Sequence, residues 1–266
     1  MSNKKINELF NLAGQTVIIT GGSMGIGYGI VKRLAEAGAN IVIADIDEIG
    51  KTKAQTISQE HDVKAIFIKT DVSSEESVKN LIAQAEKQFG KIDIFVNNAG
   101  IFPMSPTLET SLELWEKVQA INLRGVFLCC REAAKSMIKN GGGNIINIAS
   151  VDALNPSMAE LAAYDASKHG VWGFTKSFAL EMAKEKIRIN AIAPGGIRTE
   201  GVEKMTSGQT KVAEHPGAPK EAPLDVPMKR MGEPNEIATV ALFLASDASS
   251  YMTGSIVVAD GGMLLG

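Results

Sequence analysis

Tyr164 and Lys168 form the residue pair whose types and spacing most clearly suggest chemistry. They lie four residues apart in a segment with helical patterning, so their side chains leave the same face of a helix. A free phenol has a pKa of about 10 and is a poor base near neutrality, but a neighbouring ammonium would lower that pKa. Such a tyrosine could accept a proton from an alcohol or donate one to a carbonyl. An exposed helix face can carry the same spacing, so the pair needs independent support.

Two further polar residues fit the same chemistry. Ser150 follows the apolar segment 144–149, which we expect to be a strand, and ligands bind at the carboxyl ends of strands in open α/β sheets. Its hydroxyl could hold a substrate oxygen. Asn122, expected on a helix, could hold a water molecule that relays protons from Lys168. The alternatives are that the serine caps a turn and that the asparagine bonds locally.

A glycine-rich loop follows the first apolar segment, with the spacing Gly-x-x-x-Gly-x-Gly. Glycines let the backbone approach a pyrophosphate, and the N-terminus of the next helix offers free N–H groups and a positive dipole end. A tight strand-to-helix turn is the alternative. The position in the first βα unit favours a dinucleotide site. The residues expected there are Gly21, Ser23, Met24, Gly25, Ile26 and Gly27.

Asp45 ends the second expected strand. Its separation from the glycine loop along the sequence is close to that of the carboxylate that binds the adenosine ribose in dinucleotide-binding folds. A carboxylate there repels the 2′-phosphate of NADP, and the neighbours Ala44 and Ile46 offer no basic group to bind it. The sequence therefore predicts NAD as the cofactor, with Asp45 and Ile46 in contact with it. The alternative is that Asp45 only caps a helix that begins near Asp47.

Short apolar segments alternate with amphipathic ones along the chain, which predicts an α/β fold. Nearly unbroken apolar strands are typical of a parallel sheet that is covered on both faces, and the right-handed crossover rule makes it a doubly wound Rossmann sheet of about seven strands. We expect one domain over residues 1–266, in which residues 200–232 form a substrate-loop insertion. The expected strands are 16–20, 41–45, 65–68, 92–97, 144–149, 187–193 and 255–259, and the expected helices are 26–37, 74–89, 112–139, 162–184 and 234–245.

Composition argues against several functions. Of the 266 residues 45% are apolar, and 27 basic against 30 acidic residues give a net charge of −3. No strong positive field is expected that would bind nucleic acid or anionic lipid. We expect no signal peptide and find no apolar segment near the ~20 residues that span a bilayer, so the prediction is a cytoplasmic protein. Cys129 and Cys130 are adjacent and lack histidines at metal-ligand spacing, so we expect reduced core residues and no metal site.

Taken together, these motifs resemble the short-chain dehydrogenase/reductase family over nearly the whole chain. The matching segments are the loop 20–27, Asp71-Val72, Asn97-Asn98-Ala99-Gly100, Asn122, Ser150, Tyr164 with Lys168, Asn190-Ala191 with Pro194-Gly195, Thr199, and Thr253-Gly254 with Asp260-Gly261-Gly262. One departure is that Ser150 and Tyr164 are separated by one residue more than in many members. The extra residue lies within 151–163, a loop that usually shapes the substrate pocket in this family.

The resemblance implies roles for particular residues. Asn122, Ser150, Tyr164 and Lys168 would form the catalytic tetrad, of which Tyr164 and Lys168 also touch the cofactor. Asp71 and Val72 would contact adenine, and Asn98, Ala99 and Gly100 would line the cofactor and steady the sheet. Pro194, Gly195, Ile197 and Thr199 would hold the nicotinamide end. The family usually forms homotetramers, with the last strand and two long helices at the interfaces.

We therefore expect an NAD-dependent oxidoreductase that interconverts a small secondary alcohol and its ketone, with Tyr164 as general acid and base. The pocket candidates are Ile101, Pro103, Asp152, Leu154, Asn155, Met158 and Gly196. Asp152 could accept a hydrogen bond from a second hydroxyl, which would suit a sugar or polyol; the alternative is an exposed loop acid. The other candidate functions are a 3-oxoacyl-[acyl-carrier-protein] reductase and a catalytically silent NAD-binding regulatory protein.

Overall fold

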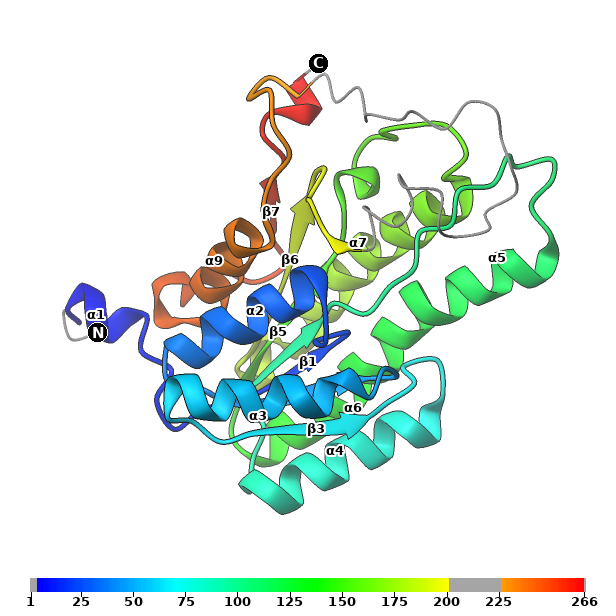
Figure 1. The fold of residues 1–266 in the computed structure, drawn as a ribbon. Coiled ribbons are helices and arrows are strands. Elements are labelled where there is room, and N and C mark those ends of the chain that lie inside the picture. Colours follow the sequence, from blue (N-terminus) through cyan, green and yellow to red (C-terminus); the bar gives the residue numbers. More distant parts are fainter. Residues whose placement is uncertain (1–3, 201–225, 266) are drawn as a thin grey trace.

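The fold is known from a computed structural model that describes residues 4–200 and 226–265 (Figure 1). Its centre is a seven-stranded parallel sheet with the order β3-β2-β1-β4-β5-β6-β7. This confirms the predicted doubly wound α/β architecture. The strands are β1 (Thr16–Thr20), β2 (Asn40–Asp45), β3 (Ala65–Lys69), β4 (Ile94–Asn97), β5 (Gly143–Ile148), β6 (Ile187–Pro194) and β7 (Ile256–Ala259).

Helices cover both faces of the sheet, which is why the strands are apolar throughout. On one face, α2 (Gly25–Glu36), α3 (Ile49–His61) and α9 (Pro234–Ala245) share a core with Ile19 and Ile43. On the other face, α4 (Glu75–Phe89), α6 (Gly125–Lys139) and α7 (Ala162–Met182) share a core with Ile18 and Val42. Successive residues of a strand thus pack into opposite layers.

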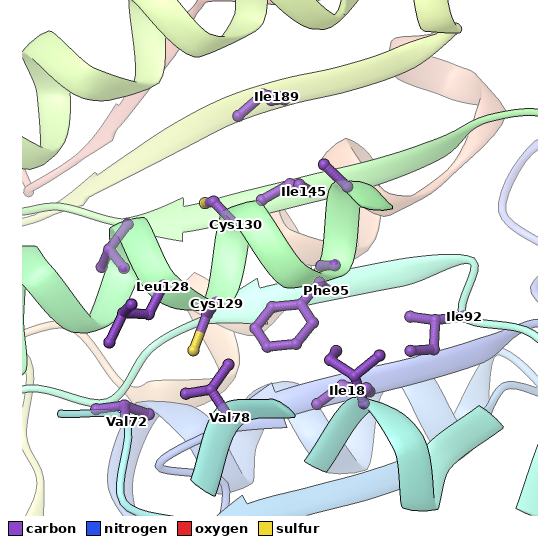
Figure 2. Packing of buried hydrophobic residues seen from close by; sticks show 14 of the residues in the cluster. Ile18, Val72, Val78, Ile92, Phe95, Leu128, Cys129, Cys130, Ile145 and Ile189 are labelled. Atoms are coloured by element: carbon purple, nitrogen blue, oxygen red, sulfur yellow. The ribbon is translucent and has the colours of Figure 1, made fainter. Parts of the chain in front are cut away.

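The second of these cores contains the adjacent cysteines. Figure 2 shows Cys129 beside Phe95 and Val78, with Cys130 nearer to Ile145. Both thiols are free and fully buried, which confirms the prediction that they are core residues. Burial raises the pKa of Cys130 to about 12, so the thiol stays protonated at neutral pH.

Two predicted elements need correction. The expected continuous helix 112–139 is divided into α5 (Leu112–Gln119), a π-helical turn (Ala120–Arg124) and α6. A π turn inserts one residue into a helix and leaves the spacing of apolar residues on either side helical, so the sequence pattern alone does not indicate it. For the second element, α3, the sequence predicted only a helix start near Asp47, without an end. The helix is mostly polar and buries Gly50, Ala54 and Ile57, so its apolar pattern is weak.

Sheet order positions the functional residues. β1 pairs in parallel with both β2 and β4. Strands β1 to β3 follow one another toward one edge of the sheet and β4 to β7 toward the other, so the strand order reverses between β1 and β4. In open α/β sheets the crevice at such a switch point, beyond the carboxyl ends of the strands, is where ligands bind. Among the described residues, no helix is both long and apolar enough to cross a membrane.

Candidate active site

The glycine loop connects β1 to α2 at the switch point. Gly21 has φ +61°, and a Cβ added to it would lie 2.9 Å from the Cα of Ala99. A Cβ on Gly27 would overlap the carbonyl oxygen of Gly21. The backbone of the loop therefore packs so closely that side chains are excluded at both positions.

The start of α2 already binds an anionic group. The N–H of Gly25 donates a 3.0 Å hydrogen bond to Oε2 of Glu200. The hydroxyl of Ser23 is buried and makes no hydrogen bond within the described part of the chain. A helix N-terminus that donates to a carboxylate, together with a buried hydroxyl that has no partner in the described residues, fits a site for a pyrophosphate. Ser23, Gly25 and Ile26 are the residues that would hold it, with Met24 exposed beside them.

Asp45 is 9% exposed and joins two loops. Its Oδ2 accepts from the N–H of Ser23 at 3.0 Å, and its Oδ1 accepts from the N–H of Asp47 at 3.1 Å. Helix α3 begins at Ile49 with Glu48 as the N-cap residue, so Asp45 does not cap that helix. Its carboxylate is held directly beside the glycine loop, and the following residue, Ile46, is exposed.

The segment Asn98–Gly100 joins β4 to the end of β1. The amide group of Asn98 donates to the carbonyl oxygens of Thr20 and Gly21, both at 3.0 Å. The hydroxyl of Thr20 accepts from the N–H groups of Asn98 and Ala99 at 3.0 and 3.2 Å. Thr20 was absent from the predicted site residues, although a threonine that ends the strand before a glycine loop was a usable signal.

The remaining residues of the predicted cofactor site lie at the carboxyl ends of other strands. Asp71 and Val72 follow β3; the carboxylate of Asp71 accepts from the N–H and O–H of Ser73 at 2.9 and 2.7 Å. Pro194 ends β6, and Gly195 and Ile197 follow it. Thr199 packs close to Gly25, since a Cβ on that glycine would lie 3.3 Å from the threonine Cγ2. The structure thus gathers the predicted cofactor residues along one edge of the sheet.

The four residues of the predicted tetrad come together beside this edge. The phenol of Tyr164 is hydrogen-bonded with Ser150, and Nζ of Lys168 lies 5.5 Å from the centre of the tyrosine ring. A Cβ on Gly100 would lie 3.3 Å from Oδ1 of Asn122 and 3.8 Å from Nζ of Lys168. The tetrad therefore adjoins the loop that follows β4.

Asn122 lies in the π-helical turn and is completely buried. Its Oδ1 accepts from the N–H of Ile101 at 2.9 Å, and its Nδ2 donates to the carbonyl oxygen of Ile101 at 2.8 Å and to Oγ of Ser167 at 3.1 Å. The local bonding considered as its alternative role is thus present, but it reaches across to other elements. A proton-relaying water at Asn122 stays a prediction.

The protonation of Tyr164 differs from the expectation. Desolvation by the surrounding protein raises the pKa of Tyr164 above its ordinary value, the charges of Asp152 and Asp165 add to the increase, and the hydrogen bond with Ser150 opposes it. Nζ of Lys168 donates to the carbonyl oxygen of Ile148 at 2.8 Å, and the charge of this lysine does not offset the increase in the pKa of Tyr164. The protein alone therefore keeps the phenol protonated, and the expected lowering is wrong for this state.

Lys168 has its own pKa lowered to about 8, because burial penalises the ammonium form more than the charge of Asp152 favours it. The unfolded chain keeps this lysine protonated up to about pH 10.4. Between these two values the unfolded state binds the extra proton, so the free energy of unfolding rises with pH.

We expect this lysine to make the wild-type protein more stable as the pH increases from 8 to 10, by up to about 3 kcal/mol. Lys168→Met has no such titration and should lack that component of the rise. Urea unfolding of both proteins across this pH range gives the difference between their free energies of unfolding. The contributions of titratable groups that both proteins share cancel in that difference. Identical pH dependence of the two proteins would show that the ammonium is not penalised in the folded state.

Asp152 is only 5% exposed, so the alternative of an exposed loop acid is wrong. Its Oδ2 accepts from the hydroxyl of Ser150 at 2.7 Å, and its Oδ1 accepts from the N–H of Ser157 at 2.8 Å. Ser150 also caps the short 3₁₀ turn Val151–Ala153, because its Oγ accepts from the N–H of Asp152 at 3.2 Å. The hydrogen bond that Asp152 would accept from a second substrate hydroxyl stays a prediction.

The other pocket candidates surround the tetrad on loops. Leu154 and Met158 are 39% and 41% exposed, which leaves apolar groups available near Ser150. A hollow of about 310 Å³ lies at the starts of α5 and α7, lined by Thr107, Thr110, Leu112, Trp115, Ala162 and Ala163. None of these residues was among the predicted pocket residues. Most of the predicted substrate loop, residues 201–225, lies outside the described residues.

Comparison with known proteins agrees with this architecture. Residues 21–264 match the family model described as enoyl-(acyl carrier protein) reductase. The chain is 40% identical to the short chain dehydrogenase/reductase astE of Aspergillus oryzae, over 97% of this chain and 98% of that one. It is also 40% identical to the 3-oxoacyl-[acyl-carrier-protein] reductase FabG of Chlamydia muridarum, over 95% of this chain and 98% of that one.

A solved structure shows the same fold with a cofactor. It is that of a candidate NAD(P)-dependent gluconate 5-dehydrogenase from Beutenbergia cavernae, with NADP bound at low occupancy. It is 32% identical, covers 97% of this chain and 100% of that chain, and has a TM-score of 0.86. The extent of these matches and the shared sheet show that the chain belongs to the short-chain dehydrogenase/reductase family of oxidoreductases.

Proposed function

We propose that this protein is an NAD-dependent oxidoreductase that interconverts a small secondary alcohol and its ketone. The observation that carries the proposal is the convergence of Ser150, Tyr164 and Lys168 beside the segment after β4 that packs against the glycine loop. A group that moves a proton thus lies next to the site suited to a nicotinamide dinucleotide. When bound, the dinucleotide supplies the acceptor or donor of hydride.

Proton transfer falls to Tyr164. In ketone reduction the phenol, which the protein keeps protonated, donates its proton to the carbonyl oxygen; in alcohol oxidation the phenolate accepts the hydroxyl proton. Lys168 is buried beside the ring, and its positive charge stabilises the phenolate that reduction leaves behind. Ser150 holds the reacting oxygen against the phenol. Asn122, through Ile101 and Ser167, fixes the loop after β4 against α7.

The panel that tests this function contains 2-butanol, cyclohexanol, mannitol, a 3-hydroxysteroid and a 3-hydroxybutyryl thioester, each with NAD or NADP. We expect NADH formation with at least one secondary alcohol. Preference for the thioester with NADP would favour the 3-oxoacyl-[acyl-carrier-protein] reductase, in line with the FabG relative. Tight NAD binding without turnover on any compound would favour a silent regulatory protein.

Cofactor choice is argued from Asp45. Its carboxylate lies beside the glycine loop, where it would accept hydrogen bonds from the ribose of NAD and repel the 2′-phosphate of NADP. The Beutenbergia structure with NADP shows that members of this family can take the other cofactor, so the preference has to be measured in this protein.

We expect wild-type kcat/KM to be higher with NAD than with NADP, and Asp45→Ala to reduce this preference by about tenfold or more, since a charge-assisted hydrogen bond and a repulsive charge are both lost. Asp47→Ala is the matched control, because it removes a nearby carboxylate that does not contact Ser23. Equal efficiency of wild type with both cofactors would refute the assignment.

A homotetramer and a cytoplasmic location complete the proposal. Large apolar side chains are exposed on the helices expected at the interfaces, including Leu112 and Trp115 on α5, Phe127 on α6 and Leu180 on α7. Exposed apolar side chains that form a contiguous patch are typical of interaction surfaces, so these residues are the ones we expect at an interface. Light scattering of the purified protein measures the mass of the assembly directly.

A further inference from the structure

We infer that Glu200 is an autoinhibitory residue, whose carboxylate occupies the pyrophosphate position at the start of α2 and has to leave it before a dinucleotide binds. The inference deepens the proposed function and rests on it for the identity of the ligand. It concerns a carboxylate that belongs neither to the predicted cofactor residues nor to the tetrad. Its consequence is that cofactor affinity is lower than the glycine loop alone would give.

The contact between Glu200 and α2 joins two segments that are far apart in the sequence. Oε2 of Glu200 accepts from the N–H of Gly25 at 3.0 Å. Gly25 is the first residue of α2 and has φ +52°. A Cβ on Gly25 would lie 3.3 Å from Cγ2 of Thr199 and 3.9 Å from Oε2 of Glu200. The first amide group of the helix therefore packs directly against the side chains of both residues.

The backbone just before Glu200 is anchored to the segment that precedes α9. The N–H of Arg198 donates to the carbonyl oxygen of Gly232 at 2.9 Å, and the N–H of Gly232 donates to the carbonyl oxygen of Gly196 at 2.9 Å. These two bonds form a short parallel bridge beside the end of β6. The carboxylate thus approaches α2 from a backbone that the sheet holds in place.

The N–H of Gly25 can serve one strong acceptor at a time. An N–H group at the start of a helix has no partner within the helix, and the positive end of the helix dipole favours an anion there. A pyrophosphate oxygen and a carboxylate oxygen at this N–H would repel each other as like charges. The two are therefore mutually exclusive, and the exposed side chain of Glu200 can turn away into solvent when the cofactor binds.

The cost of this competition follows from the fraction of molecules in which the position is free. Apparent affinity for a ligand is reduced by the fraction of the protein that is competent to bind it. A hydrogen bond to an ionised group, exposed as this one is, is strong enough to occupy the position in most molecules and weak enough for a dinucleotide to displace. Glu200 thus sets how tightly the cofactor is held without touching it.

The test is calorimetric titration with ADP, which carries the pyrophosphate, and with adenosine, which does not. We expect Glu200→Ala to bind ADP about threefold to tenfold more tightly than wild type, as for the removal of one competing hydrogen bond. NAD should follow ADP, and adenosine should bind both proteins equally. Weaker binding of ADP to Glu200→Ala would overturn the proposal, because the carboxylate would then support the glycine loop.

Glu200→Asp separates competition from simple repulsion. This variant keeps the negative charge, but its side chain is one methylene shorter and no longer reaches the N–H of Gly25 from the same backbone. We expect it to bind ADP more tightly than wild type, close to Glu200→Ala. Wild-type affinity for ADP in Glu200→Asp would overturn the proposal, since charge alone would then explain the effect of Glu200→Ala.

Glu36→Ala is the matched control for removal of a glutamate. Glu36 lies in the last turn of the same helix, where its Oε2 is 2.6 Å from Nη1 of Arg33, at the opposite end from Gly25. We expect this variant to bind ADP as wild type does. A gain in ADP affinity equal to that of Glu200→Ala would overturn the proposal, because net charge rather than position would account for both.

A crystal structure of the wild-type protein with ADP observes the displacement directly. We expect a phosphate oxygen at the N–H of Gly25 and the carboxylate of Glu200 away from it; a carboxylate still bonded to Gly25 beside bound ADP would overturn the proposal. If the variants bind ADP as expected but no alcohol is oxidised, the proposed function fails and the autoinhibition stands. Alcohol oxidation together with unaltered ADP affinity in Glu200→Ala would overturn the autoinhibition alone.

Discussion

Tyr164→Phe is expected to lower kcat by about 10²–10⁴-fold, the usual contribution of a positioned general acid or base. The variant loses the phenol oxygen that would exchange a proton with the substrate. Its ring should keep the edge-to-face packing on Phe102, whose centre lies 6.2 Å away. Binding of the dinucleotide should therefore change little, and fluorescence titration with NADH measures it alongside steady-state turnover.

A specific result would contradict this role of the tyrosine. If Tyr164→Phe oxidised the best alcohol of the panel at close to the wild-type rate, proton transfer would have to involve another group. Tyr251→Phe is the matched control, since this tyrosine is fully exposed and lies outside the predicted tetrad. It removes the same oxygen atom, and we expect it to leave kcat unaltered.

Gly27→Ala is expected to weaken NAD binding by about a hundredfold and to lower the free energy of unfolding by about 1–3 kcal/mol, as for other overpacked sites. The new methyl group would overlap the carbonyl oxygen of Gly21 and would crowd the amide group of Asn98. Relief requires the glycine loop to separate from the segment after β4, which would widen the pyrophosphate site. Calorimetric titration with NAD and urea unfolding measure the two effects.

Gly173→Ala provides the control for this substitution. Gly173 lies within α7, and nothing lies within 4 Å of the Cβ that it would gain. Alanine is favoured over glycine in a helix by about 1 kcal/mol, so this variant should be slightly more stable, with unaltered NAD affinity. Equal NAD affinity in Gly27→Ala and wild type would show that the loop does not form the pyrophosphate site.

The sequence alone was sufficient for the architecture and for the neighbourhood of the site. Unbroken apolar strands alternating with amphipathic helices favour a sheet covered on both faces, and the structure confirms it. Tyr164 and Lys168 could be paired from their separation along the chain, because helical spacing is a local property. Ser150 and Asn98 could be placed at the same edge because they follow parallel strands.

Tertiary structure decided what the local pattern does not contain. Asp152 follows Ser150 by two residues and resembles a loop acid, yet the fold buries it against the Ser150 hydroxyl. The π turn that contains Asn122 was hidden in a continuous helical period. The pKa values of Tyr164 and Lys168 depend on how much water the surrounding elements exclude and on which partner each group finds. Spacing along a helix or strand is set by backbone geometry, whereas burial and hydrogen-bond direction arise only when distant segments pack together.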